Sequence, residues 1–246
     1  MSKKYSNPPI IEAVCDFRLT PDSKWDLTIP GFIYEKVGKD FPKREQRVFQ
    51  EVEFVQSPQG FQQQIRSTER VLFLTDDGKM FIQVGPNLLA INCLKPYLTW
   101  NGFKPKIEKA FNTLVGVLEV KGLQRISLRY INRIEIPGGL VKLEDHFDFY
   151  PHLGPSLPQD MGNFIVGCLL PFRDGRDLCK VQLTPAVAEK PNHIGFLLDL
   201  DYFLSQPGGV IPNDALDWVE DAHRQVEAIF EACITDRLRK IFKEES

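Results

Sequence analysis

Residues 125–139 read RISLRYINRIEIPGG and form the longest strand pattern in the chain. Apolar and polar side chains alternate along it, as expected for a strand that buries one face and exposes the other. The apolar set is Ile126, Leu128, Tyr130, Ile134 and Ile136, and the polar set is Ser127, Arg129, Arg133 and Glu135. Gly138 and Gly139 then predict a turn. The segment therefore predicts a half-buried strand with charges on its open face.

An earlier segment, from Ile11 to Leu19, has the same alternation. Its apolar face carries Ile11, Ala13, Cys15 and Phe17, and its other face carries Glu12, Val14, Asp16 and Arg18. The preceding Asn7, Pro8 and Pro9 favour extended backbone, because proline fixes its own φ and keeps the residue before it out of the helical region. We therefore predict a second charged strand, entered through this proline pair.

The remaining pattern predicts helices and strands in a repeating order. A short helix is expected at 29–42, and an amphipathic helix at 100–120 that ends near Gly122. Strands are expected at 48–56, 60–68, 70–76 and 80–85 with its continuation 88–94, joined by tight turns at 57–60 and 75–79. Further strands are expected at 163–172, 178–187 and 193–204, after a short helix or loop at 142–150.

The last expected element is a long helix from Asp214 to Ile241, capped by Asn213 or Asp214. Its apolar stripe consists of Leu216, Val219, Val226, Phe230, Cys233, Leu238 and Ile241. A nearly constant offset along the sequence relates Ile11 to Ile126 and Trp100 to Trp218, so it aligns the first strands and the last helices of two halves. We predict an α+β fold in a single globular unit, 1–246, with two repeated strand-helix-strands-helix halves, 1–122 and 123–246. These would share a twisted antiparallel sheet of saddle or helix-grip type, with a long C-terminal helix.

Composition narrows the classes of function. A formal net charge of −3 and an isoelectric point near 5.9 argue against bulk electrostatic attachment to nucleic acid. The start, MSKKYSNPP, lacks the apolar stretch of a signal peptide, and no apolar run is long enough to span a bilayer, so we expect a cytoplasmic protein without membrane contact. The five cysteines form no CxxC pair, so neither a disulfide framework nor a zinc site is expected.

Asp199 and Asp201 are a candidate catalytic or metal-binding pair. Two positions apart on a strand, they project from one face at about 7 Å, close enough to share a divalent cation. The favoured interpretation is a polar sheet face, or acids paired with basic residues on neighbouring strands, because a carboxylate pair on one strand lacks the additional ligands and the lysine that a nuclease-type centre needs.

Arg129 and Arg133 lie four apart on one strand face. If the two charged strands are neighbours, Glu12 and Asp16 would face these arginines across the seam. Arginine suits such bidentate pairing, and it equally suits a phosphate or carboxylate ligand. The internal salt bridges are the favoured interpretation. The candidate ligand-binding residues are Arg129, Arg133, Glu12, Asp16 and Arg18.

Other chemical signatures are weak. The segment EDHFDFYPH, at 144–152, is expected to be a solvated loop, because the spacing of His146 and His152 fits no familiar metal motif. No GxGxxG, GxxxxGK[ST] or GxSxG motif occurs, and no cofactor is predicted. Most aromatic residues occupy apolar positions, so base stacking on the sheet is the less favoured alternative.

Three segments, YSNPPIIEAVCDFR, LRYINRIEI and LDLDYF, together resemble a sporadically distributed family of bacterial proteins of about this length. The resemblance covers nearly the whole chain. It implies a bacterial cytoplasmic setting and an accessory role in mobile-element or defence loci, without implying a reaction. The positions that match the family pattern are Asn7, Pro8, Pro9, Glu12, Arg18, Arg129, Tyr130, Asn132, Arg133, Asp199 and Asp201.

The leading functional prediction is a non-enzymatic binding or regulatory protein that engages a partner protein or a small ligand. A homodimer through residues 214–242 is one form this could take. The first alternative is a metal-dependent hydrolase or nuclease that uses Asp199 and Asp201, with Arg129 or Arg133 stabilising a phosphate. The second alternative is a nucleic-acid-binding module.

Overall fold

The computed structural model describes residues 4–57, 60–158 and 161–244, with the backbone alone described at 51–57 and 60–66. These residues form an α+β fold with one antiparallel sheet, as predicted. The strands are β1 Ile10–Leu19, β2 Lys43–Ser57, β3 Gly60–Leu74, β4 Met80–Gly85, β5 Leu88–Leu94, β6 Leu123–Pro137, β7 Val166–Phe172, β8 Asp177–Ala186 and β9 His193–Leu204. The helices are α1 Ile29–Val37, α2 Thr99–Val117, α3 Ala215–Cys233 and α4 Asp236–Phe242.

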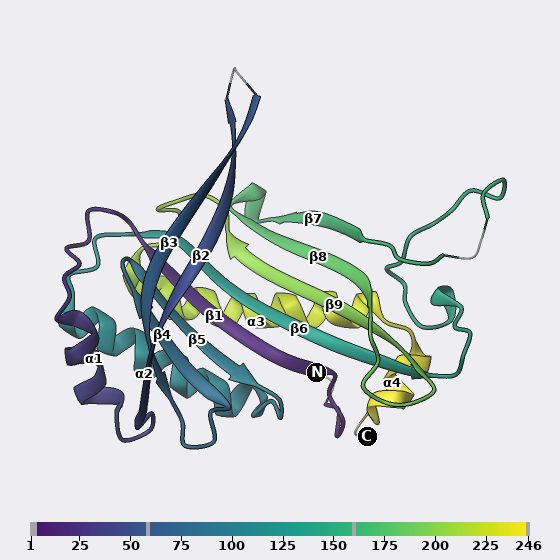
Figure 1. Ribbon diagram of the computed structural model, residues 1–246, viewed down its shortest axis with the longest axis horizontal. Helices are drawn as coiled ribbons and strands as arrows, with labels where there is room; N and C mark the ends of the chain where they lie inside the picture. The colour runs from purple at the N-terminus through teal and green to yellow at the C-terminus, as the bar shows by residue number, and fades with distance from the viewer. Residues whose placement is uncertain (1–3, 58–59, 159–160, 245–246) are drawn as a thin grey trace.

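The two charged strands predicted from the sequence are β1 and β6, and they lie side by side in the sheet. The strand order is β2-β3-β4-β5-β1-β6-β9-β8-β7, and neighbouring strands are antiparallel (Figure 1). In the register between β1 and β6, Val14 lies opposite Arg129, and Asp16 lies opposite Ser127. The side chains on the polar faces of both strands therefore share one side of the sheet.

The helices cover only one face of the sheet, behind the strands in Figure 1. The apolar side chains of β1 and β6 point toward the helices, and Ala13, Cys15, Ile126 and Leu128 are fully buried there. Helix α3 packs on β6 and β9, α2 packs on β5, and α1 packs on α2. Because the helices take up the apolar side chains, the polar residues of the same strands remain on the opposite face, called here the open face.

The strands β2 and β3 form a long hairpin that leaves the sheet as a two-stranded arm (Figure 1). Only Val71–Leu74 of β3 pairs with β4, while the β2–β3 pairing continues to Ser57 and Gly60. The two strands predicted at 60–68 and 70–76 are therefore one continuous strand. The turn predicted at 57–60 contains positions 58 and 59, which lie outside the described residues.

The long C-terminal helix is present, but the single helix predicted from Asp214 to Ile241 is wrong. Helix α3 ends at Cys233, and α4 begins at Asp236. Ile234 between them is extended and bridges to Phe147, while the Thr235 side chain donates to the Asp145 carbonyl at 2.7 Å. The 142–150 segment thus supplies hydrogen-bond partners at the helix break, which the apolar periodicity alone does not reveal.

Candidate functional site

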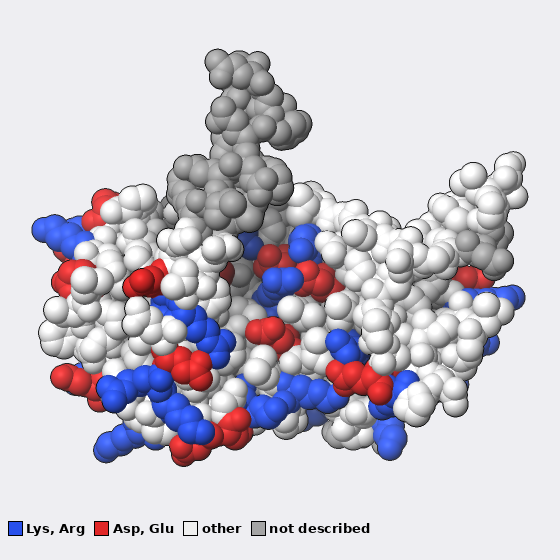
Figure 2. Space-filling model, viewed as in Figure 1, with Lys and Arg blue, Asp and Glu red and all other residues white. Residues whose placement is uncertain are grey.

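The open face carries a band of charged side chains across β1, β6, β9 and β8. On β6 the band includes Arg125, Ser127 and Arg129. Figure 2 shows basic and acidic residues interleaved in the middle of this face, with neither sign forming a continuous patch. Asp201 lies opposite both Arg129 on β6 and Lys180 on β8. The acids and bases of four strands therefore come within reach of one another.

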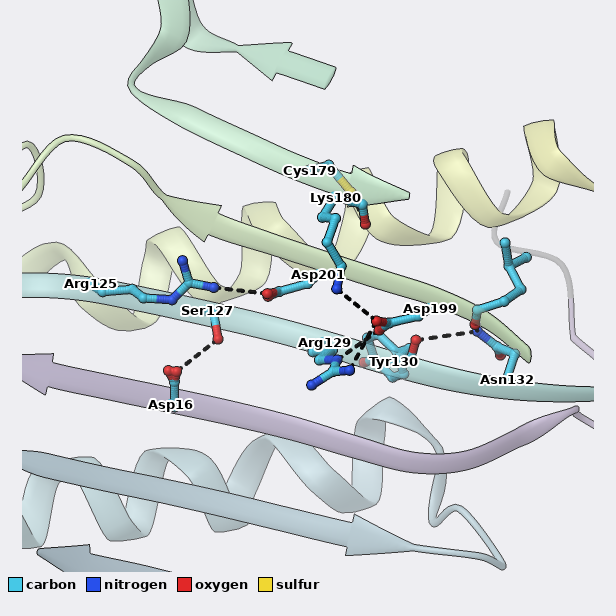
Figure 3. Close-up of polar contacts among 11 residues, drawn as sticks. Asp16, Arg125, Ser127, Arg129, Tyr130, Asn132, Cys179, Lys180, Asp199 and Asp201 are labelled. Carbon is cyan, nitrogen blue, oxygen red and sulfur yellow. Dashed lines mark hydrogen bonds and ion pairs between the residues drawn. The ribbon is translucent and has the colours of Figure 1, made fainter. Parts of the chain in front are cut away.

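One part of this band is a closed ion-pair cluster formed by Arg129, Asp199 and Lys180 (Figure 3). Arg129 donates from Nε and Nη2 to the two carboxylate oxygens of Asp199, at 2.7 and 2.9 Å. The Lys180 ammonium lies 3.0 Å from the same carboxylate. Burial alone would raise the pKa of Asp199, but its hydrogen bonds and ion pairs with Arg129 and Lys180 outweigh this and lower the pKa below its ordinary value. Both oxygens of Asp199 are therefore occupied by protein donors.

Two further predicted residues also have partners within the fold. Arg133 donates to Glu189 at 2.6 Å. Glu12 accepts a 2.8 Å hydrogen bond from Asn92, whose own side-chain oxygen accepts one from Gln83. Glu12 thus belongs to an amide network that runs from β1 to β4.

The predicted pairing of Glu12 and Asp16 with Arg129 and Arg133 is not found, although β1 and β6 are neighbours. The register places Ile131 opposite Glu12 and Ser127 opposite Asp16. Arg133 lies beyond the start of β1, where its backbone N–H donates to the Pro9 carbonyl. Arg129 therefore pairs with Asp199 of β9, and Arg133 pairs with Glu189 in the connection between β8 and β9.

The other part of the band is open, and it contains Asp16, Arg18, Arg125 and Asp201. Arg125 donates to Oδ2 of Asp201 at 2.8 Å and lies over the Phe203 ring at 3.9 Å. Ser127 donates to Oδ2 of Asp16 at 2.9 Å (Figure 3). Arg18 lies directly opposite Arg125 across the β1–β6 pair, is exposed, and has no ion pair within the part of the chain that the structure describes.

Both acids of the open part have one unsatisfied oxygen. Oδ1 of Asp16 and Oδ1 of Asp201 are buried without a hydrogen-bond donor among the described residues. Burial raises the pKa of Asp16 despite the nearby charges of Arg125 and Arg18. Burial also raises the pKa of Asp201, and the negative charge of Asp16 adds to this effect. The two carboxylates therefore lack the donors that stabilise Asp199.

Two adjoining hollows open at this end of the band. The smaller, of about 330 Å³, is lined by Val14, Asp16, Arg18, Arg125, Ser127, Arg129 and Asp201. The larger, of about 450 Å³, is lined by residues that include Arg18, Arg70, Asn87, Gln124, Arg125 and Phe203. Arg18 and Arg125 line both, so this arginine pair lies where the two hollows meet.

The geometry gives no support to the alternative that Asp199 and Asp201 share a cation. Asp199 is held by Arg129 and Lys180, and Asp201 by Arg125, which matches the second of the two favoured options, pairing with basic residues on neighbouring strands. Across 4–57, 60–158 and 161–244, no group of three or more His, Cys, Asp and Glu residues is arranged to hold a metal ion. His146, in the predicted solvated loop, donates from Nδ1 to the Lys142 carbonyl and is partly exposed.

The sequence analysis did not select Arg125, Arg70 or Asn87 as site residues. Arg125 could have been found, since it continues the polar alternation of Ser127 and Arg129 along β6. Arg70 and Asn87 reach the site from β3 and from the β4–β5 turn, where Asn87 has a φ of 54°. No periodicity predicts that these segments come close to β1 and β6.

The apolar stripe of residues 214–242, which suggested a dimer interface, faces the core. Val219, Val226, Cys233 and Leu238 are buried, and Leu216, Phe230 and Ile241 pack against the same core. No helix within the described ranges is both long and apolar enough to cross a membrane. No protein-family model matches the chain, and neither does any curated protein.

Proposed function

We propose that this chain is a non-enzymatic binding protein that holds a small anionic ligand, a phosphate or a carboxylate, on the open face. The observation that carries the proposal is the position of Arg18 directly opposite Arg125, at the junction of the two hollows. Like charges directly opposite on neighbouring strands are destabilising. An anion between the two guanidinium groups would relieve this repulsion.

The charges around the arginine pair favour an anion over a cation. Three arginines and two aspartates line the smaller hollow, but Arg129 is already paired with Asp199 and Arg125 with Asp201, which leaves Arg18 as the arginine of this hollow without an ion pair among the described residues. Guanidinium groups present paired N–H donors in a plane, and this arrangement matches the oxygens of phosphate and carboxylate. Arg125 is partly neutralised by Asp201, which makes exposed Arg18 the main ligand contact.

The other functional predictions are less well supported. A metal-dependent hydrolase would need Asp199, which is occupied by Arg129 and Lys180. A nucleic-acid-binding module would need a positive surface, whereas the charges on the open face alternate in sign (Figure 2). A partner protein remains part of the proposal, and the projecting β2–β3 arm is the segment that extends beyond the sheet to meet one (Figure 1).

We further infer that the sheet combines two related halves, 1–122 and 123–246, in a saddle. Outward from the central β1–β6 pair, the strands are β5, β4, β3 and β2 on one side and β9, β8 and β7 on the other, so the first half carries one more strand. The ligand site then lies beside the pseudo-twofold axis, where the first strands of both halves meet. Membership of the bacterial family suggested by the sequence motifs, and a cytoplasmic location, belong to the same proposal.

The proposal is tested by titrating inorganic phosphate into the purified chain in a calorimeter. We expect saturable binding that weakens about tenfold in Arg18→Gln, because a charge-assisted hydrogen bond to the anion is lost. The matched control is Arg237→Gln, an exposed arginine on α4 that pairs with Asp145. Absence of binding, or equal weakening in both variants, would contradict the proposal.

A further inference from the structure

The arrangement of the two hollows restricts the kind of anion that fits. Arg18 and Arg125 line both, so an anionic group held by this pair has space on each side. A free phosphate or carboxylate would leave both spaces to solvent. A phosphate that joins two organic groups would place one group in each hollow.

The smaller hollow offers acceptors for hydroxyl or amino donors. Oδ1 of Asp16 and Oδ1 of Asp201 are buried there without a donor, which costs free energy until a donor arrives. Their second oxygens are already occupied, by Ser127 and Arg125. Ribose hydroxyls and base amino groups are neutral donors that would satisfy the two carboxylate oxygens. A cation at the same place would be repelled by the neighbouring arginines.

The larger hollow has the features that a nucleoside requires. Its wall combines Pro86, Leu88 and Phe203 with the side chains of Thr68, Asn87 and Gln124. Oδ1 of Asn87 is another buried acceptor without a donor among the described residues. Cζ of Arg125 lies over the Phe203 ring, 3.9 Å from its centroid, and guanidinium and aromatic planes are surfaces on which nucleobases stack.

We propose that the ligand is a dinucleotide, with its linking phosphate between Arg18 and Arg125 and one nucleoside in each hollow. This inference rests on the proposed anion-binding function and adds the chemical class of the ligand. Sugar hydroxyls or base amino groups of one nucleoside donate to Asp16 and Asp201. The other nucleoside donates to Asn87 and packs against the apolar wall that includes Phe203.

The experiment compares four probes by calorimetry on the full chain: inorganic phosphate, adenosine monophosphate, the dinucleoside monophosphate ApA, and a hexa-adenylate strand. We expect affinity to rise by about tenfold from phosphate to the mononucleotide, and again to ApA, as each nucleoside adds hydrogen bonds to buried acceptors. The hexa-adenylate strand should bind no more tightly than ApA.

Two variants test the hollows separately. Asp16→Asn keeps the acceptor for Ser127 but removes the carboxylate, and Asn87→Gly suits the left-handed backbone at that position, where φ is 54°. Each should weaken ApA about tenfold while inorganic phosphate binds at least as tightly as before. Circular dichroism establishes that both variants are folded.

The outcomes separate the two proposals. Binding of phosphate with no gain for ApA would overturn the dinucleotide inference and leave the anion site standing. Failure of every probe to bind would overturn both. Binding of the hexa-adenylate strand more than about tenfold tighter than ApA would overturn the inference in favour of a nucleic-acid strand.

Discussion

Asp199 and Asp201 lie two residues apart on the same face of β9, but their surroundings have opposite effects on them. Both carboxylate oxygens of Asp199 accept hydrogen bonds from Arg129, and Lys180 forms an ion pair with the same carboxylate, so the pKa of Asp199 is lowered. One carboxylate oxygen of Asp201 accepts a hydrogen bond from Arg125, and the other has no donor among the described residues. The pKa of Asp201 is raised. Charged residues on a strand face thus identify a candidate site. The distribution of hydrogen-bond donors around the carboxylates then decides which part of the charged band is structural and which part is available to a ligand.

The largest expected effect is that of Asp199→Asn on stability. The change leaves Arg129 and Lys180 without their counter-charge, and we expect a loss of about 2 kcal/mol in the free energy of unfolding. Exposure of about two fifths of the side chains of both bases keeps the loss below that of a fully buried pair. Urea unfolding at neutral pH measures it. A loss no larger than that of Asp201→Asn would contradict the comparison.

The pH dependence of this loss follows from the lowered pKa of Asp199. A lowered folded-state pKa contributes stability above the ordinary aspartate value, about 4, and that stability disappears as pH falls through the folded-state pKa. The difference in unfolding free energy between wild type and Asp199→Asn should therefore shrink between about pH 5 and pH 2. Urea unfolding across this range checks it, and a constant difference would rule out the ion pair as its source.

Asp201→Asn should have a smaller effect, with the opposite sign. Because the pKa of Asp201 is raised, the charged form costs stability as pH rises above the ordinary aspartate value. Removing that charge should stabilise the chain at neutral pH by up to about 1 kcal/mol, since the lost pairing with Arg125 offsets part of the gain. The same urea unfolding series measures it. A clear destabilisation would show that Asp201 is as well satisfied as Asp199.

The smallest expected effect is that of Arg18→Gln on stability. Arg18 is exposed and faces Arg125, so its replacement should change the free energy of unfolding by less than about 0.5 kcal/mol. Thermal unfolding without ligand measures this. A large destabilisation would show that Arg18 has a structural role and that the closed part of the band extends to it. Together with a loss of phosphate binding, an unchanged stability would separate ligand contact from folding.

The alternation of apolar and polar residues was sufficient to predict the α+β class, the charged strands β1 and β6, and the exact bounds of β9. For the acids of β9 it left two options open, a polar sheet face or pairing with bases on neighbouring strands, and the ion pairs of Asp199 and Asp201 correspond to the second. The register between β1 and β6 could not be predicted, and that register sends Arg129 to Asp199 instead of to Glu12 or Asp16. Arg70 and Asn87 were missed because only the tertiary fold brings β3 and the β4–β5 turn to the site.

The distinction between the closed cluster and the open site is tested most directly by titrating Asp16, Asp199 and Asp201 with carboxyl ¹³C NMR, with each resonance assigned from the corresponding Asn variant. We expect Asp199 to titrate below the ordinary aspartate pKa and Asp16 and Asp201 to titrate above it. Equal pKa values for Asp199 and Asp201, or a reversed order, would contradict the distinction between a closed cluster and an open site.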